Sequence, residues 1–162
     1  MTRQLDASGQ VGSALGRRGS RRQIRLQKFL CMQTKDVMTK LVLTISQHLT
    51  LRELEPLFET HDFNGFPVVE GRHLIGLVTK FDFLKNFVFT PDTVFPHYDD
   101  LMKRSVKEVM TQNVCTVHLA TPLTRVLQMM VETRDHSFPV VDEKNRLAGI
   151  ISRGDIVRAL RG

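Results

Sequence analysis

The sequence predicts an α+β fold in which two βαββα repeats pack on each other with pseudo-two-fold symmetry. Residues 35–39 read KDVMT, and residues 107–111 read KEVMT. The segment FPVV occurs at residues 66–69 and returns unchanged at 138–141. Both pairs are separated by 72 residues (107 − 35 and 138 − 66). A repeat of about 55 to 60 residues would be marginal by itself, so we expect the two copies to pack together.

In the first copy, residues 42–45 form a β-branched run that predicts a short strand. Thr50 and Glu53 then have the spacing of a capping box, and leucines follow at helical spacing. Pro56 lacks an N–H and its ring meets the carbonyl four residues back, so we expect a kink or a short helix. The second copy has the sequence Thr-Pro at residues 121–122. It favours a helix with proline in its first turn, the more regular of the two.

Each FPVV segment and the apolar run after it predict two antiparallel strands joined by a polar turn. The turn spans residues 70–73 in the first copy and residues 142–146 in the second, which has gained one residue. A second helix is expected over about residues 81–88 and 154–160. Because a helix separates the first strand from the hairpin, that strand can pair in parallel with the hairpin and complete the βαββα order.

The repeats divide the chain into four segments: a basic tail at residues 1–33, a first repeat at 34–90, a linker at 91–104 and a second repeat at 105–162. The tail has few large apolar side chains to offset the entropy of ordering, so we expect it to be disordered. Within it, residues 23–32 could form a short amphipathic helix. The linker is rich in aromatic residues, which predicts that it packs on the repeats or on a partner subunit.

The net charge of +6 belongs to the tail, because the basic and acidic residues after position 34 cancel. The arginine-rich residues 17–28 are therefore a candidate nucleic-acid-binding segment, and an organellar transit peptide is a further interpretation of this end. Cys31 and Cys115 have no metal-binding or disulfide-type spacing, which predicts a reduced, cytoplasmic protein. No apolar run approaches the roughly 20 residues of a membrane span.

The most specific local signal is a hydroxyl residue followed three positions later by aspartate, at the start of each second helix. The pair is Thr79 and Asp82 in the first copy, and Ser152 and Asp155 in the second. Such a pair caps a helix, because its oxygens satisfy free backbone N–H groups. The same arrangement suits an anionic ligand. The helix start carries a partial positive charge, the hydroxyl can donate, and the carboxylate can accept from two ribose hydroxyls.

With these motifs, residues 34–161 resemble a tandem pair of CBS domains, also called a Bateman module. The resemblance implies that the aspartate binds the ribose of an adenosine compound and that the Thr or Ser binds its phosphate. The base would lie between apolar residues of the first strand and the backbone ahead of FPVV. The implied first site comprises Val42, Leu43, Asn64, Gly65, Thr79 and Asp82. The implied second site comprises Val114, Cys115, His136, Ser137, Ser152 and Asp155.

The resemblance further implies a regulatory sensor that binds AMP, ADP or ATP between the repeats and transmits occupancy to an unidentified protein partner. S-adenosylmethionine is a less favoured ligand, a homodimer is expected, and no cofactor is required. Lys80, Arg134, His136 and Arg153 are candidates for contact with phosphate.

We expect no enzymatic activity, because the histidines lack metal-binding spacing and no nucleophile motif occurs. The alternative function is a nucleic-acid-associated protein. It would bind through its arginine-rich tail and use the CBS pair as a dimerisation scaffold.

Overall fold

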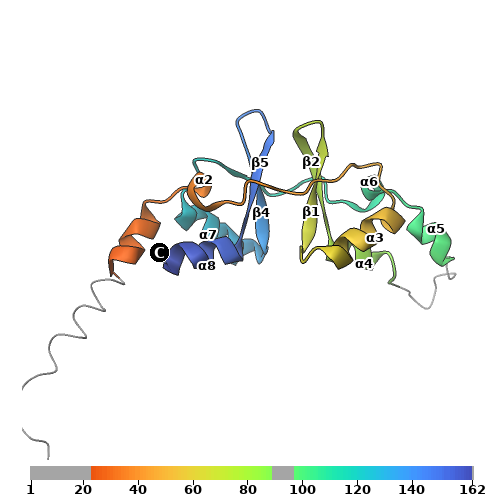
Figure 1. Cartoon of the computed structure of the whole chain (residues 1–162), viewed down its shortest axis with the longest axis horizontal. Helices are drawn as coiled ribbons and strands as arrows, with labels where there is room; N and C mark the ends of the chain where they lie inside the picture. The colour runs from red at the N-terminus through yellow and green to blue at the C-terminus, as the bar shows by residue number, and fades with distance from the viewer. Residues whose placement is uncertain (1–22, 89–96, 162) are drawn as a thin grey trace, which may run out of the picture.

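The computed structural model describes residues 23–88 and 97–161, which form two similar units side by side (Figure 1). This arrangement confirms the predicted α+β class. The first unit contains α3 (Leu51–Thr60), β1 (Gly65–Glu70), β2 (His73–Thr79) and α4 (Lys80–Lys85). The second contains β3 (Val117–His118), α7 (Leu123–Thr133), β4 (Ser137–Val141), β5 (Leu147–Ser152) and α8 (Arg153–Arg161). Shorter helices precede the units: one at residues 23–30, α2 (Thr34–Val37), α5 (Tyr98–Met102) and α6 (Val106–Val109).

Both predicted hairpins are present. β1 pairs antiparallel with β2, and β4 pairs antiparallel with β5. β3 pairs in parallel with β4, as the crossover predicts. The first unit has no matching strand, because only Ile45 of residues 42–45 bridges in parallel, to Val68. Residues 42–43 instead border a cavity between the units.

The helix after the first strand begins where the capping box predicts. The Thr50 N–H donates to Glu53 Oε2 at 2.8 Å, and the Glu53 N–H donates to Thr50 Oγ1 at 3.4 Å. α3 then continues for 10 residues through Pro56, so the expectation of a short helix is wrong. Thr60 Oγ1 donates to the Pro56 carbonyl at 2.7 Å and supports the last turn. In α7, Pro122 is the N-cap residue and does not lie in the first turn.

The second unit is completed by a helix from the start of the first repeat. α2 docks beside α7, where Thr34 donates both its N–H and its hydroxyl to the Thr121 carbonyl, at 2.9 and 2.8 Å. The Lys35 N–H donates to the Leu119 carbonyl at 3.0 Å. Thr34 is fully buried in this contact.

The first unit receives the equivalent helix from the second repeat. In α6, the N–H groups of Val106 and Lys107 donate to the carbonyls of Leu49 and Gln47, at 2.7 and 2.9 Å. Val106 is fully buried in the first core. Each repeat therefore exchanges its opening helix with the other, and neither unit is complete without both halves of the chain.

The segments that follow the exchanged helices cross from one unit to the other. Thr39 and Ile150 exchange two backbone hydrogen bonds, both 2.9 Å long, and Thr111 and Leu77 do the same at 2.9 Å. The backbones approach so closely that a Cβ atom on Gly149 would lie 2.6 Å from the Thr39 carbonyl oxygen. The glycine repeated in each hairpin is explained by this approach.

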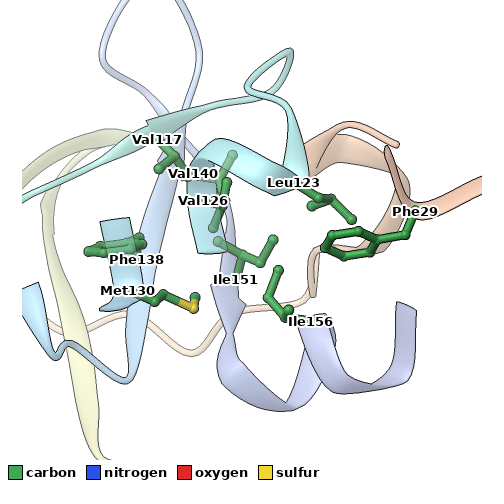
Figure 2. Packing of buried hydrophobic residues seen from close by; sticks show 9 residues of the cluster. All are labelled: Phe29, Val117, Leu123, Val126, Met130, Phe138, Val140, Ile151 and Ile156. Carbon is green, nitrogen blue, oxygen red and sulfur yellow. The ribbon is translucent and has the colours of Figure 1, made fainter. Parts of the chain in front are cut away.

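Each hydrophobic core receives a side chain from a short helix outside the α3–α4 or β3–α8 segment that forms its unit. Phe29, 3% exposed, projects from the helix at residues 23–30 toward Leu123 and Ile156 of the second core (Figure 2). Met102 of α5 is buried in the first core. The basic tail was predicted to reach residue 33 with a possible short helix at 23–32, and the structure has that helix at residues 23–30. Residues 1–22 lie outside the described residues.

The beginning of the region between the repeats packs on the first unit through aromatic rings. The centroid of Phe87 lies 5.2 Å from that of Phe83 and 6.0 Å from that of Tyr98. α4 ends earlier than expected, and Asn86 Nδ2 donates to the Phe83 carbonyl at 3.1 Å just beyond its last residue. Of the linker predicted at 91–104, residues 91–96 lie outside the described residues.

Replacing Phe29 by alanine is expected to lower the free energy of unfolding by about 3 kcal/mol, because the substitution leaves a cavity in the second core. Ile24→Ala on the same helix is the matched control, since Ile24 is 60% exposed. It should change stability by less than about 0.5 kcal/mol. Urea denaturation at pH 7 measures both. Equal stability of the Phe29 variant and the wild type would mean that this helix is not part of the core.

Candidate ligand-binding cleft

The two hydroxyl and aspartate pairs form matching capping boxes at the ends of β2 and β5. The Ser152 N–H and hydroxyl donate to Asp155 Oδ2 at 2.7 and 2.8 Å, and the Asp155 N–H donates back to Ser152 Oγ at 3.3 Å. The corresponding distances for Thr79 and Asp82 are 2.9, 2.6 and 3.1 Å. The capping role predicted from the sequence is confirmed at α4 by both reciprocal bonds.

Each capping aspartate is buried and also holds a cation from its own helix. Asp155 is 1% exposed and pairs through Oδ1 with Arg158, one turn further along α8. Asp82 is 5% exposed, and its Oδ1 lies 2.6 Å from Lys85 Nζ. In both carboxylates, Oδ2 therefore accepts the capping hydrogen bonds, while Oδ1 pairs with an exposed cationic side chain.

The ionisation of Asp82 is governed by opposing effects. Burial is the largest single effect and disfavours the charged carboxylate, but hydrogen bonds from Lys85 and Thr79 favour it, as does the charge of Lys85. Together these bonds and this charge outweigh burial and hold the pKa of Asp82 below its ordinary value of 3.8. Asp82 is therefore an anion at neutral pH.

A cavity of about 370 Å³ opens between the units, next to the Ser152 and Asp155 pair. Its volume lies within the range of small-molecule sites. Eight of the predicted site residues line it. They are Val42, Leu43, Asn64 and Gly65 from the first repeat, and His136, Ser137, Ser152 and Asp155 from the second.

The cavity groups these residues differently from the sequence prediction, which assigned each site mainly to one repeat. Ser152 and Asp155 of the second repeat share the cavity with residues 42–43 of the first, because the segment after α2 crosses between the units. The crossing of residues 111–115 over β2 is the pseudo-symmetric arrangement. Thr111 bridges to Leu77 of β2 there, and Val114, Cys115, Thr79 and Asp82 do not border the cavity.

One cation at the cavity is held in place by backbone carbonyls. Arg153 donates Nε to the Asp135 carbonyl at 3.1 Å and Nη2 to the Arg134 carbonyl at 2.7 Å. Arg134 has φ 60°, and its role here is to accept through its carbonyl. The side of the cavity near Ser152 therefore carries Arg153 and His136, two of the four predicted phosphate contacts.

Sequence reasoning missed several residues of the cavity wall. Leu41, Pro67 and Ile150 add apolar surface, and Phe63 adds an aromatic ring in the loop between α3 and β1. Phe63 directly precedes the predicted Asn64, so its position was the available signal. Asp62 adds a carboxylate next to it.

Three further features are a metal site, a membrane span and the candidate nucleic-acid segment. Within residues 23–88 and 97–161, no three His, Cys, Asp or Glu side chains are grouped to hold a metal ion. In the same residues, no helix combines the length and the apolar character needed to cross a membrane. Of the candidate nucleic-acid segment at 17–28, residues 17–22 lie outside the described part of the chain.

The family model described as CBS domain matches this chain twice, at residues 35–88 and 106–162. The chain belongs to the CBS-domain family. An uncharacterized protein of Methanocaldococcus jannaschii is 32% identical to this CBS pair over 127 residues. The match covers 78% of this chain and 39% of that relative, so the chain spans well under half of the relative's length.

Two solved CBS structures share this fold. One is the CBS domain pair of protein MJ0100 in complex with 5′-methylthioadenosine and S-adenosyl-L-methionine, with a TM-score of 0.66 and 27% identity. The match covers 81% of this chain and 97% of the MJ0100 chain. The other is CBSX2 in complex with AMP, with a TM-score of 0.67 and 25% identity, covering 78% of this chain and 94% of its own. Both relatives were solved with adenosine compounds.

Because the pKa of Asp82 is lowered in the folded state, the stability of the fold depends on pH in the acidic range. A carboxyl group whose pKa is lower in the folded state stabilises the fold above its unfolded pKa, and this contribution disappears as pH falls through the folded value. We expect wild-type stability to decline as pH falls below about 3.8, the ordinary value for aspartate, and Asp82→Asn to flatten that decline. Thermal unfolding of both proteins at a series of pH values from 7 to 2 measures this dependence. Parallel curves for the two proteins would contradict the assignment.

Proposed function

We propose that this CBS pair is a regulatory module that binds an adenosine nucleotide in the cavity between its repeats. The observation that carries the proposal is the meeting, in one cavity, of the Ser152 and Asp155 pair with an apolar wall from the other repeat. A nucleotide has the same two-part character, an apolar base joined to a polar ribose phosphate. Its two ends would contact different repeats.

The polar end of the cavity suits ribose and phosphate. Asp155 is a buried carboxylate, and its Oδ1 can accept from ribose hydroxyls once Arg158 moves aside. Ser152 stands at the start of α8, where free N–H groups and the helix dipole favour an anion. Arg153 and His136 border the same space and supply donors to phosphate.

The charge of the cavity bears on which adenosine compound it takes. Arg153 and Arg158 place two guanidinium groups near Ser152, and a phosphate is attracted to them. The sulfonium of S-adenosylmethionine is positively charged at the corresponding part of the molecule, so these groups repel it. We therefore rank AMP, ADP and ATP above S-adenosylmethionine, although the MJ0100 relative was solved with the latter.

Regulation would follow from the position of the ligand between units that are already joined by exchanged segments. A ligand that contacts residues 42–43 and Asp155 together stabilises the arrangement of the units that it fits best. At 100 times its Kd, such a ligand would stabilise that arrangement by about 2.7 kcal/mol. Since α8 begins at the site, its position can report occupancy to a partner protein or to a second copy of the chain. In this proposal the chain performs no catalysis.

Asp155→Asn is expected to weaken AMP binding about 30-fold, because an amide replaces the carboxylate that accepts from ribose at a cost of about 2 kcal/mol. The matched control is Glu108→Gln. Glu108 caps α6 through the same reciprocal bonds with Ser105 but does not border the cavity. Isothermal titration calorimetry with AMP, ADP, ATP and S-adenosylmethionine measures the affinities.

The control variant should bind AMP like the wild type. If wild-type protein binds none of the four compounds, the proposal is wrong. If both variants lose affinity equally, the loss comes from destabilised helix caps, and Asp155 is not a ribose ligand.

A further inference from the structure

The aromatic ring of Phe63 stands at the wall of the cavity that the two repeats share. We propose that Phe63 stacks on the ligand base, which makes it the base-selecting residue and makes this cavity the preferred site of the two pseudo-symmetric positions. The inference rests on the proposed function and adds how the base is recognised. Phe63 is 46% exposed although it is a large apolar residue, and it borders the cavity.

The ring is held in one orientation by its neighbours. The His61 ring lies parallel to Phe63, with centroids 5.4 Å apart and an interplanar angle of 3°. The Phe66 ring meets it edge to face at 5.9 Å and 81°. Phe66 is fully buried, so the pair is fixed to the first core. A ring that is already oriented loses little conformational entropy when a base stacks on it.

The cavity wall around Phe63 is suited to a planar apolar group. Leu43 and Pro67 are further apolar residues of the wall, and the side chain of Asn64 adds an amide. An amide can donate to and accept from the edge of a base. Ribose and phosphate groups would lie toward Ser152 and Asp155, which come from the other repeat. Phe63 thus supplies the base contact that the sequence motifs do not contain.

The second pseudo-symmetric position lacks this ring. The 72-residue offset that relates the repeats places Asp135 where the first repeat has Phe63, and Cys115 where it has Leu43. Burial and then the charge of Asp135 raise the pKa of the Cys115 thiol. A carboxylate offers no ring on which a base can stack. The duplication has therefore left two unequal positions.

The chain contains no tryptophan, which allows a direct optical test. In Phe63→Trp, adenine should stack on the indole ring. Titration with AMP should therefore quench the tryptophan fluorescence, and the quenching should saturate. Ribose 5-phosphate, which has no base, should leave the fluorescence unchanged. Phe81→Trp is the matched control at the second pseudo-symmetric position, because Phe81 directly precedes Asp82, is 70% exposed and does not border the cavity. Its fluorescence should not respond to AMP.

Affinity gives an independent measurement. Phe63→Ala should weaken AMP binding about 5- to 150-fold, the range for removal of one base-stacking ring, whereas Phe63→Tyr should restore it. CMP has a smaller base than AMP. The ratio of the affinity for AMP to the affinity for CMP should therefore be smaller in Phe63→Ala than in the wild type. A purely structural defect would lower both affinities in the same proportion and leave that ratio unchanged.

The outcomes separate the two proposals. If wild-type protein binds AMP by calorimetry but Phe63→Trp shows no quenching, or Phe63→Ala binds as tightly as Phe63→Tyr, stacking is wrong and the nucleotide function stands. If the control Phe81→Trp is quenched as strongly as Phe63→Trp, the preference for this cavity is wrong. If wild-type protein binds no adenosine nucleotide, the proposed function is wrong and the role of Phe63 falls with it.

Discussion

The exchange of opening helices between the repeats is the constraint on which the rest of this structure depends. The backbone of α2 donates to the second unit through Thr34 and Lys35, and α6 returns equivalent bonds through Val106 and Lys107. A buried N–H without a partner is costly, so neither helix can leave its place without loss of stability. The crossing segments that follow are therefore held against the opposite hairpin. The cavity exists because those segments bring the wall of one repeat to the capping motif of the other.

The capping motif itself serves local structure and the site at once. Asp155 uses one carboxylate oxygen to satisfy the backbone and hydroxyl of Ser152, which begins α8 without any ligand. Its other oxygen is neutralised by Arg158, a side chain that remains largely exposed. A buried carboxylate would be expensive without such partners. The same arrangement at Asp82 and Lys85 shows that this solution belongs to the repeat. The difference between the two positions comes from the residues around them.

Local features of the fold were predictable from the sequence, and contacts between distant segments were not. The hairpins and the capping box at Thr50 follow from residues within a few positions of each other. Pro56 was expected to kink or shorten its helix, but α3 continues through it for 10 residues. The exchange left no local signal, so the site residues were grouped by repeat. A short helix at residues 23–32 was predicted as possible, but not that its Phe29 joins the second core. The family resemblance supplied half of the cavity residues but did not include Phe63, which directly precedes the predicted Asn64.

The residue gained in the second hairpin turn has a mechanical consequence. Asn145 adopts φ 56°, donates Nδ2 to the Leu74 carbonyl at 3.2 Å and accepts from the Leu74 N–H at 3.2 Å. The Leu147 N–H donates to the Arg72 carbonyl at 2.9 Å. The tips of the two hairpins are thus hydrogen-bonded to each other, whereas the cavity residues Gly65, Ser137 and Ser152 lie at the opposite ends of their strands. The two sheets are thus joined at the ends away from the cavity, while the paired bonds of Thr39 and Ile150 hold the crossing segment to β5 beside it, so the site is braced on both sides.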